Sequence, residues 1–239
     1  MPLSERVRNE SAAERIRPLK VLGSRDDQLL VHEVYASIQG ESTWAGVPCV
    51  FVRTTGCHLR CSYCDTEHAF HEGKIQSIDE VVAAVRAYKI PLVEVTGGEP
   101  LLQKALPELL RRLLADELTV LVETSGAVST AGIDPRVRLI VDIKTPGSGE
   151  AARNRAENLA HLKPNLDELK FVITDDADYE WARDFVRSQP IPAGVAVLFS
   201  PALPGMAPPQ LAQRIVADRL PVRFQLQLHK VLWGDRPGV

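Results

Sequence analysis

The regular alternation of predicted strands and helices most constrains how this chain can fold. Apolar segments typical of strands occupy residues 30–38, 47–54, 92–96, 118–123, 137–143, 169–173, 195–199 and 223–228. Helical segments separate most of them, at residues 77–88, 103–115, 150–161, 177–188 and 208–219, the first opened by a capping box from Ser77 to Glu80. Because crossover helices join neighbouring parallel strands, this order predicts an α/β fold with a parallel sheet.

Polar or glycine-rich motifs follow the ends of several of these strands. In a barrel of parallel strands, active sites collect at the carboxyl edge of the sheet. The order is therefore compatible with one shared cavity mouth for residues 57–66, Gly97-Gly98-Glu99, Thr124-Ser125, Lys144, Ser200 and His229.

Three cysteines, Cys57, Cys61 and Cys64, lie within eight residues of one another. A [4Fe-4S] cluster has four irons, each of which takes a thiolate ligand. Three local cysteines leave one iron without a protein ligand, and that iron can bind a small molecule. The spacing, with aromatic Tyr63 just before the third cysteine, favours a catalytic cluster over an electron-transfer centre.

Two other uses of these cysteines compete with a cluster. Joined by His58 or His68, they would form a Cys₃His zinc site, although structural zinc sites usually draw their ligands as two separated pairs. A disulfide framework is disfavoured because four cysteines are few for 239 residues. The fourth cysteine, Cys49, lies in an apolar run at residues 47–52 and is expected to be a buried core thiol.

Composition indicates an ordinary globular protein. Hydrophobic residues make up 45% and charged residues 25%, and the net charge of −3 gives no broad attraction to nucleic acid or anionic lipid. Residues 1–20 lack the apolar core of a signal peptide, and no apolar run reaches the roughly 18 residues of a membrane helix. Because exposed thiolates that hold iron need a reducing compartment, we expect a cytoplasmic protein without nucleic-acid or membrane partners. We expect a polar N-terminal extension at residues 1–28 and one catalytic domain at residues 29–239.

The cysteine loop and the later Gly97-Gly98-Glu99-Pro100 motif together resemble the radical S-adenosylmethionine (SAM) superfamily. In those enzymes a similar Gly-Gly-Glu-Pro motif binds the amino group of SAM. The resemblance implies a partial (β/α)₆ barrel of the TIM type.

A narrower resemblance rests on an ordered set of motifs between residues 38 and 230. Together they resemble the 7-carboxy-7-deazaguanine synthase family. The usual Gln-Gly-Glu-Gly of that family is Gln-Gly-Glu-Ser here, with Ser42 at its end. The motifs are Ile38-Gln39-Gly40-Glu41, Phe51-Val52-Arg53, Cys64-Asp65-Thr66, Thr96-Gly97-Gly98-Glu99-Pro100-Leu101, Glu123-Thr124-Ser125-Gly126, Asp142-Ile143-Lys144 and Gln227-Leu228-His229-Lys230.

This resemblance implies a radical lyase reaction in queuosine or another deazapurine pathway. The substrate would be 6-carboxy-5,6,7,8-tetrahydropterin, and ring contraction with loss of ammonia would give 7-carboxy-7-deazaguanine. The implied cofactors are a [4Fe-4S] cluster, SAM and Mg²⁺. The implied partners are the pterin, a flavodoxin-type or similar one-electron donor and a second copy of the chain in a homodimer.

Residue roles follow from the matching motif positions, and none is a certain catalytic acid or base. Cys57, Cys61 and Cys64 match the cluster ligands, and Thr66 matches a magnesium ligand, with a simple helix cap as its alternative. Arg53 offers a fork of donors to a carboxylate, and its alternative is a surface salt bridge. The substrate contacts are Ile38, Gln39, Gly40, Glu41, Arg53, Thr96, His229 and the terminal carboxylate of Val239, with Lys230 beside them. The SAM contacts are Tyr63, Gly98, Glu99, Ser125, Lys144, Ser200, Pro201, Ala202 and Leu203.

Two other functions remain open at the level of sequence. A glycyl-radical activating enzyme shares the three-cysteine spacing and acts on a protein, but it gives no reason for Gln39-Gly40-Glu41 or for Gln227-Leu228-His229-Lys230. A non-enzymatic zinc or iron–sulfur binding module would need the cysteine loop alone.

Overall fold

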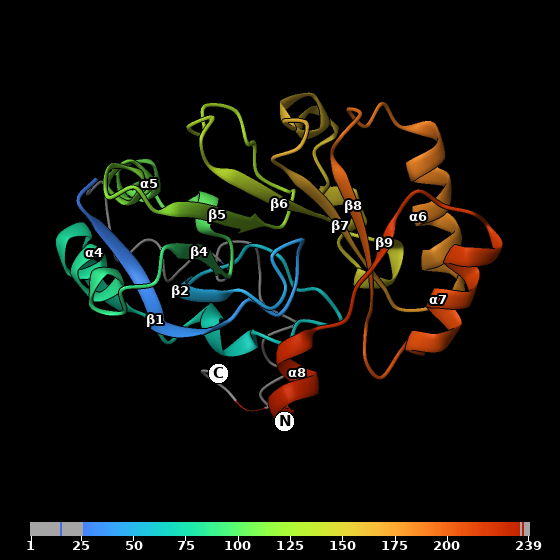
Figure 1. Ribbon diagram of the computed structural model, residues 1–239, viewed down its shortest axis with the longest axis horizontal. Helices are drawn as coiled ribbons and strands as arrows, with labels where there is room; N and C mark the ends of the chain where they lie inside the picture. The colour runs from blue at the N-terminus through green and yellow to red at the C-terminus, as the bar shows by residue number, and fades with distance from the viewer. Residues whose placement is uncertain (1–14, 16–25, 235, 237–239) are drawn as a thin grey trace.

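The computed structural model describes residues 15, 26–234 and 236, which build one nine-stranded sheet flanked by helices (Figure 1). The strand order is β3-β1-β2-β4-β5-β6-β7-β8-β9. The strands are β1 Gln28–Ile38, β2 Pro48–Thr54, β3 Lys74–Ser77, β4 Leu92–Gly97, β5 Thr119–Thr124, β6 Arg138–Ile143, β7 Glu168–Ile173, β8 Ala196–Pro201 and β9 Arg223–Phe224. The α-helices are α4 Ile78–Ala87, α5 Leu106–Ala115, α6 Asp176–Ser188, α7 Pro208–Ala217 and α8 Leu228–Trp233. Short 3-10 helices occupy Glu67–Phe70, Pro100–Leu102, Pro146–Ser148, Ala151–Arg153 and Ala156–His161.

The predicted α/β fold is confirmed. Strand β2 pairs in parallel with β4, and every further neighbour out to β9 is also parallel. Strand β1 instead runs antiparallel to both β2 and β3, an edge that simple strand–helix alternation does not predict. Only residues 39–47 join β1 to β2, which is too short for the crossover that a parallel pair requires.

Buried aliphatic faces attach the helices to the sheet. Helix α4 turns Ile78, Val81, Val82 and Val85 toward the core, and the corresponding leucines of α5 join the same cluster. The predicted capping box at the start of α4 is present, since the Ser77 hydroxyl accepts from the backbone of the residue three positions later. In Figure 1, α4 and α5 lie toward the left end of the sheet, and α6 and α7 lie toward its right end beside β8 and β9.

Two predicted elements have a different form in the structure. The single helix expected at residues 150–161 is replaced by two short 3-10 helices. The side chain of Asn154 exchanges two hydrogen bonds with the backbone of Lys144, at 2.9 and 2.8 Å, and this holds the chain away from a continuous helix. The expected last strand stops after Phe224, and α8 follows because Leu228 N donates to Gly40 O at 2.7 Å.

Ser42, the departure from the family motif, adopts the left-handed conformation that favours glycine. Its φ is +62°, and its hydroxyl accepts a hydrogen bond from Trp44 N at 3.0 Å. Single left-handed residues other than glycine persist where local hydrogen bonds support them. The turn therefore keeps a glycine-like backbone although it carries serine.

Within the described ranges, none of the helices combines the length and the apolar character that crossing a membrane requires.

Candidate active site

One cavity of about 800 Å³ collects the predicted motifs at the carboxyl ends of the parallel strands. Its lining contains nearly every site residue expected from the sequence. Glu99 lies beneath the surface rather than in the lining, and Val239 lies outside the described residues. The predicted residues in the lining are Ile38, Gln39, Gly40, Glu41, Arg53, Cys57, Cys61, Tyr63, Cys64, Thr66, Thr96, Gly98, Ser125, Lys144, Ser200, Pro201, Ala202, Leu203, His229 and Lys230.

The cysteine loop is fixed by the segment that follows β6. Ser62 N donates to Ser148 O at 3.0 Å, and Arg60 N donates to the carboxylate of Glu150 at 2.7 Å. The Arg60 guanidinium donates to Cys57 O at 2.9 Å and lies 4.0 Å from the centre of the Phe70 ring. These contacts hold the loop in place from two sides, as a ligand loop for an inorganic cluster requires.

The three loop thiols are not gathered closely enough to hold a single zinc ion together. All four cysteines are free. Zinc–sulfur bonds of about 2.3 Å bring tetrahedral sulfur ligands within about 4 Å of one another. In the described part of the chain, the three loop thiols do not form a group of ligand atoms within 4.8 Å. Cys49 is fully buried in the apolar cluster of Phe51, Leu92 and neighbouring side chains, so the structure confirms its predicted core role.

Burial sets the protonation of the loop thiols. It raises the pKa of Cys57 to about 12 and that of Cys61 to about 11, because a buried thiolate loses its hydration. Such thiols become ligands only when a bound metal supplies compensating positive charge. The loop therefore fits a metal cluster better than it fits a free nucleophilic cysteine.

The Gly97-Gly98-Glu99 turn packs directly on the start of the cysteine loop. A Cβ on Gly98 would lie 2.3 Å from Gly56 O, so no other residue fits without moving the backbone. Glu99 is fully buried, where it accepts hydrogen bonds from Thr124 Oγ1 at 2.8 Å and Ser125 N at 2.8 Å. Glu99 thus positions Ser125 at the cavity wall instead of facing the cavity itself.

Three motifs distant in sequence meet around Gln227. Its side-chain amide donates to Glu41 Oε1 at 2.8 Å and to Asp65 Oδ2 at 3.1 Å. Lys230 Nζ lies 3.0 Å from the same Asp65 oxygen and holds the pKa of that carboxyl below its usual range, although burial alone would raise it. A Cβ on Gly40 would lie 2.0 Å from the His229 ring, so this glycine leaves room for the imidazole.

A buried charged network joins predicted site residues to Glu94, Glu123 and Lys170, which the sequence did not identify as site residues. Lys170 Nζ lies 2.8 Å from Glu123 Oε1 and also pairs with Glu41, while Thr96 Oγ1 donates to Glu123 at 3.3 Å. Gln39 donates its amide hydrogen to Glu94. The sequence carried one signal for these residues, since each strand places an ionisable side chain inside an apolar run.

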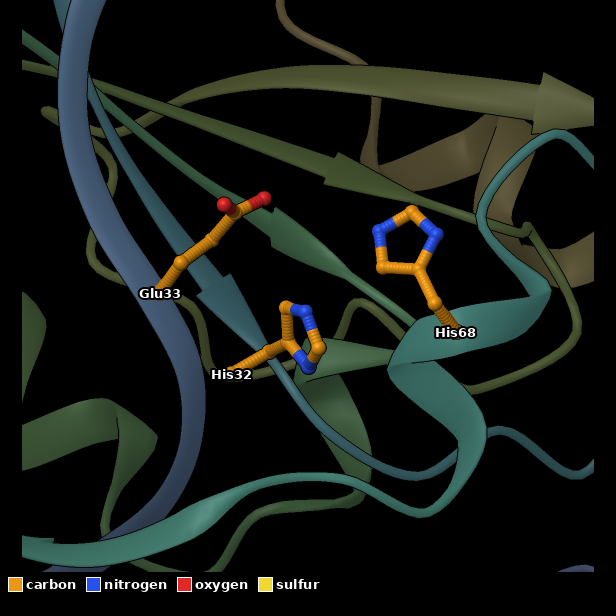
Figure 2. Close-up of side chains that lie close together, drawn as sticks. All are labelled: His32, Glu33 and His68. Atoms are coloured by element: carbon orange, nitrogen blue, oxygen red, sulfur yellow. The ribbon is translucent and has the colours of Figure 1, made fainter. Parts of the chain in front are cut away.

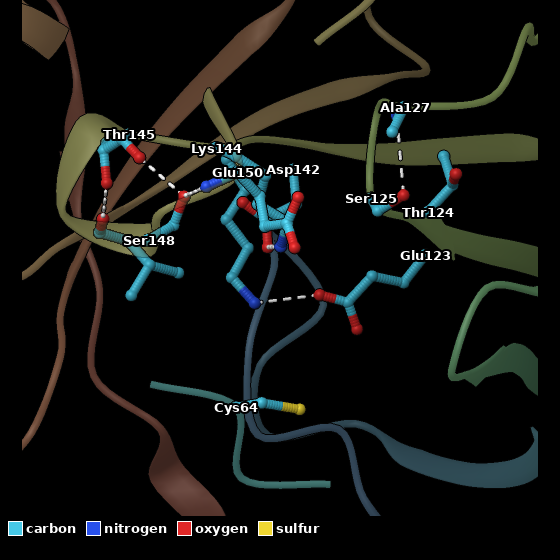
Figure 3. Close-up of polar contacts among 12 residues, drawn as sticks. Cys64, Glu123, Thr124, Ser125, Ala127, Asp142, Lys144, Thr145, Ser148 and Glu150 are labelled. Atoms are coloured by element: carbon cyan, nitrogen blue, oxygen red, sulfur yellow. Dashed lines mark hydrogen bonds and ion pairs between the residues drawn. The ribbon is translucent and has the colours of Figure 1, made fainter. Parts of the chain in front are cut away.

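Several buried polar atoms at the cavity have no hydrogen-bond partner among the described residues. They are Tyr63 OH, Asp142 Oδ1 and Ser200 Oγ. Lys144 Nζ donates to the other Asp142 oxygen at 2.6 Å (Figure 3). The same Nζ lies 5.8 Å from the Tyr63 ring centre. Buried polar groups are rarely left unpaired, so these atoms mark a wall that a polar ligand would complete.

The structure bears on the alternative roles of Thr66 as a helix cap and of Arg53 as a surface salt bridge. Thr66 precedes the 3-10 helix Glu67–Phe70, but its side chain makes no capping hydrogen bond there, which removes the helix-cap alternative. Arg53 does form an ion pair, with Nε 2.8 Å from Glu33 Oε1, and it donates to the Tyr35 hydroxyl at 2.8 Å. This pair lies in the cavity wall, with the Arg53 side chain 15% exposed, rather than on the outer surface.

Glu94 provides a pH-dependent contribution to stability. Burial raises its pKa well above the ordinary value, and the charges of Glu123 and Glu41 raise it further. The folded protein thus holds a proton that the unfolded chain releases near pH 4.3, so this contribution is lost as the pH rises through the raised pKa. As the pH rises from 5 to 8, we expect the free energy of unfolding of Glu94→Gln to increase by at least about 1 kcal/mol relative to that of the wild type.

Urea titrations at pH 5, 6.5 and 8 measure this difference. The matched control is Glu108→Gln, a carboxylate on the surface of α5 that pairs with Arg111 and is 41% exposed. Parallel pH profiles for the wild type and Glu94→Gln would mean that Glu94 ionises normally in the folded protein.

Comparison with known proteins agrees with this geometry. The profile of the radical SAM superfamily matches residues 51–146. The 7-carboxy-7-deazaguanine synthase of Chlorobaculum tepidum is 44% identical over 219 residues, which cover 90% of this chain and 100% of that protein. The enzyme of the same name from Koribacter versatilis is 45% identical over 218 residues, which cover 85% of this chain and 96% of that protein.

A solved structure shows the same fold. The structure of QueE from Escherichia coli has a TM-score of 0.71 at 20% identity and covers 92% of this chain and 100% of that one. The extent and level of identity to the curated enzymes, joined to the shared fold and the cysteine loop, lead to one conclusion. This chain belongs to the 7-carboxy-7-deazaguanine synthase family of the radical SAM superfamily.

Proposed function

We propose that this chain converts 6-carboxy-5,6,7,8-tetrahydropterin to 7-carboxy-7-deazaguanine and ammonia by a radical ring contraction. One observation carries the proposal: a single cavity holds the three-cysteine loop together with the Gln39-Gly40-Glu41 turn, Arg53 and the Gln227–Lys230 segment. A glycyl-radical activating enzyme would need the first of these but not the others. The named relatives also favour the small-molecule reaction.

Membership of the radical SAM superfamily implies a [4Fe-4S] cluster and SAM. Once bound, these cofactors supply the one-electron cleavage of SAM that starts the reaction on the substrate. Cys57, Cys61 and Cys64 would hold the cluster. The SAM molecule would lie against Gly98, Tyr63, Ser125, Lys144 and residues 200–203. Support comes from the unpaired Tyr63 and Ser200 oxygens at that wall and from Glu99, which fixes Ser125.

The opposite wall is suited to a pterin that carries a carboxylate. The guanidinium of Arg53 would face the carboxylate as a fork of donors, while Glu33 and Tyr35 hold it in orientation. Gln39, Glu41 and Thr96, joined by Ile38, Gly40 and His229, would contact the ring system.

The buried charges at this wall serve orientation rather than proton transfer. Lys170 pairs with both Glu41 and Glu123, so neither carboxylate swings freely. Polar groups that are fixed before binding cost little reorganisation when charge develops on the substrate. The chain would thus hold the pterin in a fixed pose and exclude water from it.

Thr66 would hold a magnesium ion, which would supply positive charge for the carboxylate of the substrate. A hydroxyl oxygen suits Mg²⁺, which prefers oxygen ligands in octahedral geometry. Thr66 lines the cavity two residues after Cys64, and its hydroxyl is 3.7 Å from the Cys64 sulfur. We expect product formation to rise with added Mg²⁺ in the wild type and to lose most of that response in Thr66→Ala.

Initial rates across a magnesium titration measure this effect, with Thr66→Ser as the control that keeps the hydroxyl. An unchanged magnesium response in Thr66→Ala would remove this residue from the metal site.

Two partners complete the proposal. A flavodoxin-type or similar protein would deliver the electron to the cluster. A second copy of the chain would form a homodimer, which the exposed apolar side chains of Val231 and Leu232 on α8 support. These two side chains are 66% and 52% exposed.

The decisive experiment incubates anaerobically reconstituted protein with carboxytetrahydropterin, SAM, Mg²⁺ and a chemical reductant. Mass spectrometry should show 7-carboxy-7-deazaguanine together with ammonia. Substrate deuterated at C6 should transfer deuterium to 5′-deoxyadenosine. SAM cleavage by a fully loaded cluster without pterin turnover would overturn the proposal.

A further inference from the structure

A second group of side chains that could hold a metal ion lies outside the cysteine loop, and two of its members, Glu33 and His68, line the cavity. One ligand atom each from His32, Glu33 and His68 lies within 4.8 Å of the others (Figure 2). The two imidazole rings have centres 4.9 Å apart and are tilted by 53°. We propose that these three side chains bind a divalent transition-metal ion of the zinc class, separate from both the iron–sulfur cluster and the magnesium ion.

A β-bulge brings two adjacent residues of β1 together. Neighbouring side chains of a regular strand point to opposite faces, which would separate His32 from Glu33. Val31 lies opposite Thr54 and Glu33 opposite Arg53, so His32 is an additional residue in the pairing with β2. Bulges redirect side chains and are common next to active sites. Figure 2 shows His32 and Glu33 on the same side of β1, facing His68.

The third ligand comes from the element that follows the cysteine loop. His68 belongs to the 3-10 helix Glu67–Phe70, which begins three residues after Cys64. A metal ion here would therefore connect β1 to the end of the cluster loop. That placement gives the ion a structural consequence, because it would restrain the loop that carries the three thiolates.

Two polar atoms in the group are suited to a metal. His32 Nδ1 is buried and has no hydrogen-bond partner among the described residues, a state that costs free energy unless a ligand satisfies it. Glu33 uses Oε1 to accept from Arg53 Nε at 2.8 Å, which leaves its second oxygen for an ion. A hydrogen bond of this kind orients a metal-bound carboxylate.

The ligand set selects the class of metal. Two imidazoles and one carboxylate suit Zn²⁺ and related ions, whereas Mg²⁺ prefers an all-oxygen set. The positive charge of Arg53 opposes any cation here, so only an ion that binds imidazole strongly would remain. Three protein ligands leave a position for water, as in zinc sites with an open coordination position.

Zinc content of the cluster-loaded protein tests the proposal. Protein purified anaerobically with its cluster is dialysed against micromolar ZnCl₂ in millimolar MgCl₂, and zinc and iron are measured by mass spectrometry. We expect about one zinc ion per chain in the wild type. His32→Asn and His68→Asn should each weaken zinc binding by about tenfold or more while the iron content stays the same.

The matched control is His71→Asn, because His71 lies three residues beyond His68 and outside the ligand group. Its zinc content should equal that of the wild type. Glu33→Gln, which keeps the shape of the side chain, should also weaken zinc binding, and it serves if a histidine variant fails to retain its cluster. The proposal would be overturned if Glu33→Gln and His68→Asn both bound zinc as tightly as the wild type. It would also be overturned if His71→Asn lost as much zinc as the ligand variants. Because no turnover is measured, this result is independent of the ring-contraction proposal.

Discussion

Replacing Cys61 with alanine is expected to remove the cluster and reduce SAM cleavage to background. The loop offers three thiolates, and its thiols are too widely spread for a single zinc ion. Losing one thiolate leaves two protein ligands for a four-iron cluster. A second iron then has no protein ligand, is exposed to solvent and can leave the cluster. Cys57→Ala and Cys64→Ala should behave in the same way. Iron content, the broad absorption near 400 nm and the yield of 5′-deoxyadenosine measure the loss.

Cys49→Ala is the matched control for this series. Cys49 is fully buried, yet it packs among apolar side chains of the sheet, so its loss should cost only packing energy. The reconstituted variant should keep wild-type iron content and SAM cleavage. A cluster that survives Cys61→Ala but disappears in Cys49→Ala would contradict the assigned ligand set.

The local chemistry of the site was predictable because short segments carry it. The three cysteines lie within one loop, so their spacing can be read directly from the sequence. Gly97 and Gly98 follow the next predicted strand of the parallel sheet, so the strand order places them at the same edge of the sheet as that loop. The packing role of these glycines depends on the assembled fold, because a Cβ on Gly98 would collide with Gly56 O at 2.3 Å.

The features that escaped prediction depend on long-range pairing. The bulge at His32 exists only in the register between β1 and β2, and no local pattern of residues announces it. The polar and apolar residues after Phe224 fit a strand as well as a helix. The helix forms there because the Gly40 carbonyl, far away in sequence, accepts from Leu228 N.

The charged network also could not be predicted from local sequence, because its residues meet only in the folded protein. Lys170 lies in β7, Glu123 in β5 and Glu41 in the turn after β1, so only the assembled sheet brings them into contact. Burial alone would lower the pKa of Lys170, but the two carboxylates raise it well above its ordinary value. The ammonium thus stays charged and offsets the repulsion between its partners.

Lys170→Met is therefore expected to lower the free energy of unfolding by about 3–5 kcal/mol, because one buried charge is removed and its partners remain. Methionine fills a similar volume, so the loss would be electrostatic rather than a packing defect. Burial alone raises the pKa of Glu41, and Lys170 holds it below its ordinary value. Without that lysine, Glu41 would take up a proton more readily, so the deficit in the free energy of unfolding relative to the wild type should shrink as the pH falls from 8 to 5.

Urea unfolding of Lys170→Met and of Lys104→Met tests this expectation at both pH values. Lys104 pairs with Asp26 at 2.7 Å, but both side chains are more than half exposed. Surface pairs of this kind contribute up to about 1 kcal/mol, so Lys104→Met should stay close to the wild type at either pH. A deficit in Lys170→Met that does not change with pH would indicate lost packing in place of lost charge. Equal stability of the two variants would mean that the ammonium of Lys170 does not hold Glu41 and Glu123 together.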